Sequence, residues 1–237
     1  MRTKAWRSLL LSLALVGTVL VGGCAQTGDT DVPDLKVLFI GNSFTFYNGG
    51  IDQVLHGLAP RTQVDSATQG GYKLSDHLAD QATMTKLRQP GWNRVVLQEQ
   101  SQVPVWSYST FVSSAATLAS EVRKTGATPL LMMTWARPDS KGVTTAALAS
   151  AFADAGKRLK TKVIPAGTAF GASLKAHPQL ALNVNDGHPT KEGTYLAGCV
   201  TFATIFGKSP VGNTFTGGLD AEVARTLQEE AARAVLG

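Results

Sequence analysis

One stretch near the start of the chain, residues 36–50 (KVLFIGNSFTFYNGG), constrains the fold more than any other. Its apolar run Val37–Ile40 ends at a glycine, which is typical of a strand buried on both faces of a parallel sheet. Gly41-Asn42-Ser43 predicts a sharp turn, and a helix is expected from about Ile51. In open α/β sheets the carboxyl ends of the strands form the rim where ligands bind. Ser43 is therefore either a nucleophile, if a histidine reaches it, or a turn residue that caps a helix, and this stretch alone favours neither.

The composition predicts one folded α/β domain. The chain has 237 residues, of which 43% are hydrophobic and 16% charged, and these values allow a packed core and exclude global disorder. The net charge is +5, but Arg2, Lys4 and Arg7 lie in the first 23 residues, which hold no acid, so the remainder carries +2. No run of basic residues is interleaved with aromatic ones, and we expect no nucleic-acid partner.

The N-terminus has the pattern of a secretion signal. Met1–Arg7 is basic and Ser8–Val21 is almost wholly apolar, which suits a signal-peptide core but is short for a membrane span. The sequence VGGC at residues 21–24 resembles a bacterial lipobox, which implies cleavage before Cys24 and lipidation of its thiol. We expect a lipoprotein signal over residues 1–23, then lipidated Cys24 and a flexible tether over residues 24–34. The membrane of the bacterial cell envelope would then be a partner, outside the cytoplasm. An ordinary secretory signal with an incidental cysteine is the alternative.

Apolar runs alternate with helical patterns over residues 35–237. Strands are expected at Lys36–Ile40, Thr62–Ser66, Arg94–Gln98, Pro129–Thr134 and Lys162–Pro165. Helices are expected near Ile51–Leu58, Leu74–Arg88, Thr110–Lys124, Thr144–Lys160, Lys191–Phe206 and Leu219–Leu236. This alternation predicts a parallel sheet of about five strands, covered by helices on both faces in three layers. Cys199 falls in an apolar helical pattern and is expected to be a small buried hydrophobe.

One of the four histidines lies in a segment suited to catalysis. His188 is in the turn-rich segment 185–190 (NDGHPT), just before a helical pattern, and Asp186 stands two residues upstream. A carboxylate can orient such a histidine so that its other ring nitrogen takes a proton from a serine hydroxyl. The alternative is ordinary turn chemistry, with Thr190 as the cap of the next helix. The remaining histidines lie in helical patterns or a loop and are interpreted as ordinary residues: His56, His77 and His177.

Together with the serine turn, this segment resembles the SGNH hydrolases, also called GDSL-type esterases. That superfamily has a flavodoxin-like three-layer fold and places its catalytic serine after the first strand and its catalytic histidine in a C-terminal loop. Four blocks match in order: VLFIGNSFT (37–45), ATQGG (67–71), VVLQEQSQ (95–102) and DGH (186–188). The chain is most similar to a bacterial branch with the motifs GNSFT, LQEQS and TWAR, and the resemblance spans about Leu35–Phe215.

The resemblance implies a Ser-His-Asp triad. Ser43 would be the nucleophile and His188 the general base. The family spacing is Asp-x-x-His, and Asn185 holds that aspartate position here, with Asp186 one residue closer to the histidine. We assign Asp186 as the orienting residue, because a carboxylate stabilises an imidazolium and an amide does not. Asn185 or a backbone carbonyl remains the alternative.

The resemblance also implies an oxyanion hole. The backbone N–H groups of Ser43 and Gly71 would contribute to it. The family adds an asparagine amide from the third block, but this chain has only glutamines there. A glutamine carries the same amide on a longer stem, and we assign Gln100 to this role, with Gln98 and Gln102 as alternatives.

The function implied is an extracytoplasmic ester hydrolase that needs no metal or organic cofactor. The family's substrates are acyl esters, often O-acetylated carbohydrates. Nothing in the sequence distinguishes a glycan ester from a lipid ester, or indicates an oligomeric state. The chain has no G-x-S-x-G, so it is not a nucleophile-elbow α/β-hydrolase. Two alternatives stay open: a catalytically silent surface lipoprotein that binds glycan, and an acyltransferase with the same triad.

Overall fold

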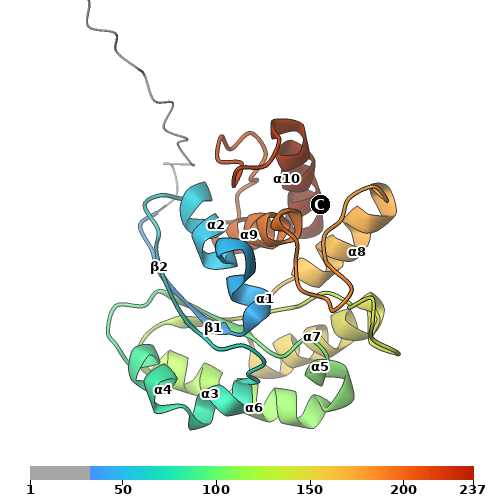
Figure 1. Ribbon diagram of the computed structural model, residues 1–237. Coiled ribbons are helices and arrows are strands. Elements are labelled where there is room, and N and C mark those ends of the chain that lie inside the picture. Colours follow the sequence, from blue (N-terminus) through green and yellow to red (C-terminus); the bar gives the residue numbers. More distant parts are fainter. Residues whose placement is uncertain (1–32) are drawn as a thin grey trace, which may run out of the picture.

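A computed structural model describes residues 33–237 and shows a five-stranded parallel sheet between two layers of helices (Figure 1). The strands are β1 (Lys36–Gly41), β2 (Gln63–Thr68), β3 (Arg94–Gln98), β4 (Thr128–Met132) and β5 (Lys162–Ile164). Their order in the sheet is β2-β1-β3-β4-β5. The predicted three-layer fold is confirmed, and all five expected strands are present. Residues 1–32, which hold the predicted signal peptide, Cys24 and most of the predicted tether, lie outside the described residues.

The apolar run in β1 serves two separate cores. Val37 and Phe39 pack into the cluster on one face of the sheet, whereas Leu38 and Ile40 pack into the cluster on the other. Successive side chains of a strand point to opposite faces, so a strand with both faces covered needs apolar residues at every position. All four side chains are at most 1% exposed. The central position of β1 between β2 and β3 explains why its sequence is a continuous run.

Two sets of helices cover the sheet, one on each side in Figure 1. The first layer contains α2 (Ile51–Leu58), α8 (Ala166–Ala176), α9 (Lys191–Phe206) and α10 (Ala221–Leu236). The second layer contains α3 (Leu74–Ala79), α4 (Gln81–Leu87), α5 (Val103–Trp106), α6 (Tyr108–Lys124) and α7 (Thr145–Leu159). No helix among residues 33–237 is both long enough and apolar enough to cross a bilayer.

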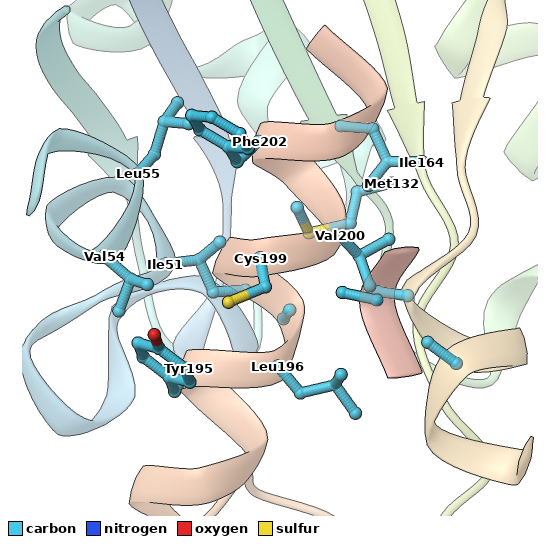
Figure 2. Packing of buried hydrophobic residues seen from close by; sticks show 14 of the residues in the cluster. Ile51, Val54, Leu55, Met132, Ile164, Tyr195, Leu196, Cys199, Val200 and Phe202 are labelled. Carbon is cyan, nitrogen blue, oxygen red and sulfur yellow. The ribbon is translucent and has the colours of Figure 1, made fainter. Parts of the chain in front are cut away.

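Helix α9 is the central element of the first layer, and Figure 2 shows its side chains between α2 and the sheet. Twelve of its sixteen residues are buried, because it also packs against α8 and α10. Cys199 is fully buried, as predicted. Gly198 permits the close approach of α2, since an added Cβ atom would lie 2.2 Å from Val54 Cγ1. This packing holds α9, and the loop that precedes it, firmly against the sheet.

The helical predictions missed the one-turn helices and were wrong in two longer segments. The pattern over residues 74–88 forms two helices, because Asp80 ends α3 and its side chain accepts the backbone N–H groups of Ala82 and Thr83 at the start of α4. Helix α8 was not predicted at all. Its sequence, AGTAFGASLKA, is rich in glycine and other small residues, which lack a clear apolar periodicity. One of these glycines, Gly167, is required for packing, because its Cβ atom would meet Thr134 O at 2.0 Å.

Candidate active site

Ser43 begins a one-turn helix, α1 (Ser43–Phe46), directly after the end of β1. Asn42 shapes this turn: its Oδ1 accepts the backbone N–H of Phe44 at 3.1 Å, and its Nδ2 donates to the Tyr72 carbonyl at 2.9 Å. The backbone N–H of Asn42 donates to Gln98 Oε1 at 2.8 Å, at the end of β3. The turn that carries Ser43 is therefore tied to the end of β3 and to the loop that follows β2.

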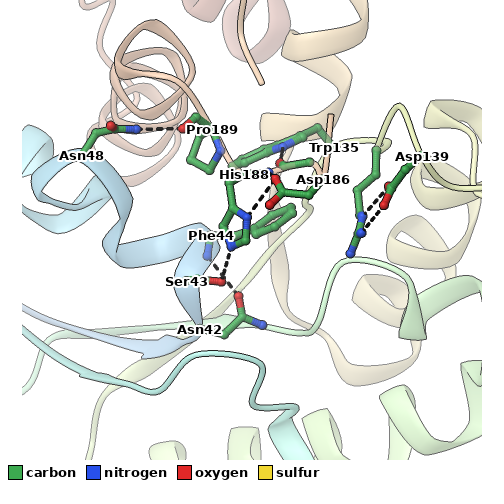
Figure 3. A network of polar contacts seen from close by, with 11 residues as sticks. Asn42, Ser43, Phe44, Asn48, Trp135, Asp139, Asp186, His188 and Pro189 are labelled. Atoms are coloured by element: carbon green, nitrogen blue, oxygen red, sulfur yellow. Dashed lines mark hydrogen bonds and ion pairs between the residues drawn. The ribbon is translucent and has the colours of Figure 1, made fainter. Parts of the chain in front are cut away.

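The structure brings His188 to Ser43 across 145 residues of sequence. His188 Nε2 lies 2.8 Å from Ser43 Oγ (Figure 3). The histidine loop is closed by its own backbone, because Val184 N–H donates to the His188 carbonyl and Gly187 N–H donates to the Val184 carbonyl. The Trp135 indole N–H donates to the Gly187 carbonyl at 2.8 Å and ties the loop to the segment that follows β4.

Two aromatic side chains flank the His188 imidazole. The Tyr47 ring stacks on it with ring centroids 4.2 Å apart, and the Phe44 ring lies 5.4 Å away at a tilt of 58°. Asn48 adopts a left-handed conformation (φ 52°), and its Nδ2 donates to the Pro189 carbonyl at 2.7 Å. This bond joins the segment that carries Tyr47 to the residue after the histidine. Aromatic packing therefore helps to fix the plane of the imidazole.

Asp186 contacts His188 in a loosely directed way. Its Oδ1 accepts the backbone N–H of His188 at 3.0 Å and lies 3.0 Å from the imidazole Nδ1. The second contact lacks the alignment of a hydrogen bond, so the buried Nδ1 has no well-directed partner within residues 33–237. The backbone N–H and imidazole of His188 lower the pKa of the Asp186 carboxyl. Its side chain is 62% exposed, which weakens any ion pair. Asn185 is exposed and forms no hydrogen bond in the described chain.

A pocket of about 180 Å³ opens beside the Ser43–His188 contact. It is lined by Asn42, Ser43, Phe44, Gly71, Gln100, Ser101, Arg137 and His188. Within residues 33–237, neither the Ser43 nor the Gly71 backbone N–H donates a hydrogen bond. Gly71 has φ +77°, which an L side chain rarely adopts. In the same described part, no group of three or more His, Cys, Asp or Glu side chains is placed to hold a metal ion.

The three candidate glutamines have different environments. Gln98 is buried below the serine turn, where its Oε1 accepts from the Asn42 N–H and the Thr45 hydroxyl and its Nε2 donates to the Glu99 carbonyl. Gln102 precedes α5 and does not line the pocket. Gln100 lines the pocket, and its Oε1 accepts two backbone N–H groups of the following turn, which leaves its Nε2 as the unused donor.

His77 has a role that the helical pattern did not predict. It is 1% exposed, with Nε2 2.8 Å from the Gly41 carbonyl and Nδ1 3.0 Å from Thr83 Oγ1. Burial lowers the pKa of this imidazole. The ring therefore supports the end of β1, two residues before Ser43. Its two hydrogen-bond partners lie on β1 and α4, so the pattern of residues within the helix that carries His77 could not reveal them. Trp135 is 1% exposed and stacks between Phe44 and Phe170.

This sheet order, with helices on both faces and a serine after the first strand, is the SGNH hydrolase-like fold. A candidate SGNH hydrolase from Slackia heliotrinireducens matches with a TM-score of 0.64 and 27% identity, over 73% of this chain and 100% of that one. A DUF4886 family protein from Bacteroides uniformis has a TM-score of 0.68 and 18% identity, over 85% and 95%. A catalytic mutant of an acetylxylan esterase from Geobacillus stearothermophilus has a TM-score of 0.54 and 13% identity, over 76% and 94%.

Comparison at the level of sequence adds nothing to this result. The chain matches no protein-family model, and it matches no curated protein. The neighbours under 25% identical establish the fold alone, and two of them are acetylxylan esterases. This fold is therefore one that hydrolases use.

Proposed function

We propose that this protein is a serine ester hydrolase with Ser43 as nucleophile and His188 as general base. The observation that carries the proposal is the 2.8 Å contact between Ser43 Oγ and His188 Nε2 at the rim of the sheet. A serine hydroxyl is a weak nucleophile unless a base within hydrogen-bond reach removes its proton, and this distance satisfies that requirement. A pocket beside the pair provides space for the acyl group.

The reaction proceeds in two halves. Ser43 Oγ attacks the ester carbonyl carbon while His188 Nε2 takes the hydroxyl proton, and the carbonyl π electrons move onto oxygen. When the tetrahedral intermediate collapses, His188 returns the proton to the departing alcohol, which leaves Ser43 acylated. Water then attacks the acyl-enzyme in the same way, with His188 as base, and releases the carboxylic acid and free Ser43.

Three donors in the pocket are placed to stabilise the oxyanion. The backbone N–H groups of Ser43 and Gly71 have no partner in the described chain, and Gln100 has an unused amide donor. Donors that are already oriented when the charge develops lower the barrier, and each contributes about 10²–10³ in kcat. Gln100 is favoured over Gln98, which does not line the pocket and whose Oε1 and Nε2 both form hydrogen bonds below the serine turn.

Asp186 and Tyr47 both stabilise the imidazolium in this proposal. Asp186 contributes its charge at 3.0 Å from Nδ1, and Tyr47 contributes the negative face of its ring at 4.2 Å between centroids. Because Asp186 is exposed and its contact is not aligned, the aromatic stack carries a larger share of the positioning than in a triad with a buried aspartate.

The proposed substrate is an ester with a small acyl group, and O-acetylated carbohydrate is the favoured class. A pocket of about 180 Å³ is smaller than the roughly 300–1,000 Å³ of sites that enclose drug-sized ligands, so it suits an acetyl group with the alcohol portion outside. One structural neighbour is an acetylxylan esterase. From the N-terminal pattern we further propose that Cys24 anchors the protein to a membrane of the bacterial cell envelope, outside the cytoplasm.

The decisive experiment compares hydrolysis of p-nitrophenyl acetate by the full chain in detergent and by its Ser43→Ala variant. We expect the variant to lose essentially all enzymatic turnover while its circular dichroism spectrum is unchanged. Equal rates for the two folded proteins would contradict the proposal. Acetylated xylan and acetylated peptidoglycan would then be compared as natural substrates, with released acetate as the readout.

The unaligned Asp186–His188 contact favours one rival function, a catalytically silent protein that binds glycan in the same pocket. This rival predicts no Ser43-dependent turnover, together with glycan binding that persists in the Ser43→Ala variant. An acyltransferase would use the same residues and pass the acyl group to a sugar hydroxyl instead of water. Acetylated sugar formed when an acceptor sugar is added would identify that activity.

A further inference from the structure

Glu99 is a fully buried carboxyl group that the proposed mechanism does not use. It is 0% exposed, and no Lys, Arg or His side chain within residues 33–237 forms an ion pair with it. Its Oε2 is buried without a hydrogen-bond partner in the same part of the chain. Burying an unpaired carboxyl is costly, so its position directly beside the pocket requires a physical reason.

The other carboxyl oxygen joins two loops of the site. Oε1 accepts the backbone N–H of Gln100 at 2.7 Å and that of Leu74 at 3.1 Å. Leu74 is the first residue of α3 and follows the Gly71 turn by three residues, whereas Gln100 lies in the loop after β3. One oxygen atom therefore bridges the segment that carries Gly71 and the segment that carries Gln100.

A second contact ties the same turn to the nucleophile. Asn42 Nδ2 donates to the Tyr72 carbonyl, one residue beyond Gly71. The Gly71 turn is thus held between Asn42 on one side and Glu99 on the other. Without the Glu99 contacts, nothing among these side-chain bonds would fix Gln100 relative to Gly71.

We propose that Glu99 is a positioning residue, which holds the oxyanion donors Gly71 and Gln100 at a fixed separation by accepting an N–H from each of their loops. The proposal rests on the proposed ester hydrolase function. Glu99 touches neither substrate nor reacting atoms, and it acts only through the two loops. Oxyanion stabilisation depends on donors at about 2.7–3.1 Å from the oxygen on which the charge develops, so the bridge affects kcat more than substrate binding.

The protonation of Glu99 is compatible with this role. The pKa of this carboxyl is raised to about 7, mainly because the group is buried. The two N–H groups and the charge of Lys73 lower the pKa by less, and the charge of Asp76 raises it slightly. A proton on Oε2 leaves Oε1 free to accept both N–H groups. In that form the bridge also places no full negative charge behind the oxyanion.

Two substitutions distinguish the effect of the length of the Glu99 side chain from the effect of its charge. Glu99→Gln keeps the length and the Oε1 acceptor but removes the charge, whereas Glu99→Asp keeps the charge but is one methylene shorter and does not reach both loops. With p-nitrophenyl acetate and the full chain, we expect E99Q to retain kcat within about 3-fold. We expect E99D to lose roughly 10- to 100-fold in kcat with KM changed less than about 3-fold, part of the loss seen when one oxyanion donor is removed.

The matched control is Glu230→Asp on α10, a carboxylate that is 4% exposed and bonded to His177 and Arg233 away from the pocket. We expect E230D to reduce stability without reducing kcat. If E99D keeps the wild-type kcat, or if E99Q loses as much as E99D, the positioning role of Glu99 is wrong.

Amide hydrogen exchange tests the bridge without reference to activity. The Leu74 and Gln100 amides should exchange at least about 10-fold faster in E99D than in the wild type, and close to the wild-type rate in E99Q. Unchanged exchange at both amides in E99D would overturn the bridge itself. Wild-type protein without Ser43-dependent turnover would instead overturn the ester hydrolase function, and the exchange result would still decide whether Glu99 joins the loops.

Discussion

The two sides of the candidate site are held in different ways. On the nucleophile side, Ser43 stands on a turn fixed by buried hydrogen bonds that involve the side chains of Asn42, Gln98 and His77. On the base side, His188 lies in a loop fixed by backbone bonds and aromatic rings, beside a carboxylate that is 62% exposed. Removing one member of a buried polar network leaves its partners unsatisfied and costs much stability, whereas an exposed charge pair contributes little stability. Substitutions should therefore be more damaging on the nucleophile side.

The largest effect is expected for Gln98→Leu. The substitution leaves the Asn42 N–H and the Thr45 hydroxyl buried without an acceptor, and each unsatisfied group costs about 1–3 kcal/mol. We expect the free energy of unfolding in urea to fall by about 4 kcal/mol and kcat to fall roughly 100-fold, because the serine turn moves. Gln89→Leu, at an exposed position, is the control. A kcat for Q98L close to the wild-type value would remove the distinction between the two sides.

The next effect concerns the pH dependence of stability on the nucleophile side. The pKa of Glu99 is about 7 in the folded protein, above its ordinary value of 4.5, so the folded state binds this proton more tightly than the unfolded state does. The contribution of Glu99 to the stability of the protein is then highest below pH 4.5. It decreases as the pH rises to about 7 and stays lower above that pH. The total change is up to about 3 kcal/mol. Glu99→Gln should remove it.

The measurement is urea unfolding of the wild type and E99Q at pH 5 and pH 8. The stability of the wild type relative to E99Q should decrease between these two pH values, whereas groups common to both proteins cancel. An equal pH dependence in the two proteins would mean that Glu99 titrates normally and that the bridge is an ionised carboxylate at neutral pH.

The sequence allowed the sheet to be predicted well because burial acts on every residue of a central strand. Val37–Ile40 is apolar at each position since both faces of β1 are covered. Helix α8 was not predicted because its buried face does not consist of large apolar side chains. Close packing on Thr134 requires a glycine, Gly167, and a glycine contributes nothing to an apolar period. Local pattern therefore describes an element well only where one simple requirement, burial of a face, determines its sequence.

The candidate site was less accessible from sequence than the fold. Ser43 and His188 are 145 residues apart, and only a resemblance to a known family suggested that they meet. The choice among Gln98, Gln100 and Gln102 depended on hydrogen bonds between separate strand ends, which no spacing along the chain records. The role of Glu99 could not be predicted from the sequence for the same reason, because its two hydrogen-bond partners lie in different loops.

On the base side, Asp186→Asn should lower kcat by about 10- to 30-fold, far less than the roughly 10⁴-fold known for a buried triad aspartate. The reason is that Asp186 is exposed and its contact with Nδ1 is not aligned. Asn185→Ala serves as the comparison, with kcat expected within about 2-fold of the wild type. A larger loss in N185A than in D186N would make Asn185 the orienting residue and contradict our assignment.

The smallest effect is expected for Tyr47, and it tests how the base is held. Tyr47→Leu removes the ring that stacks on His188, and we expect kcat to fall about 5- to 10-fold, within the energy range of an exposed stacking or cation–π contact. Stability should change little, because the side chain is 41% exposed. Tyr47→Phe keeps the ring and should restore most of the activity. If Y47F is as impaired as Y47L, the hydroxyl and not the stacked ring is the functional group, and the base side would depend on a polar contact like the nucleophile side.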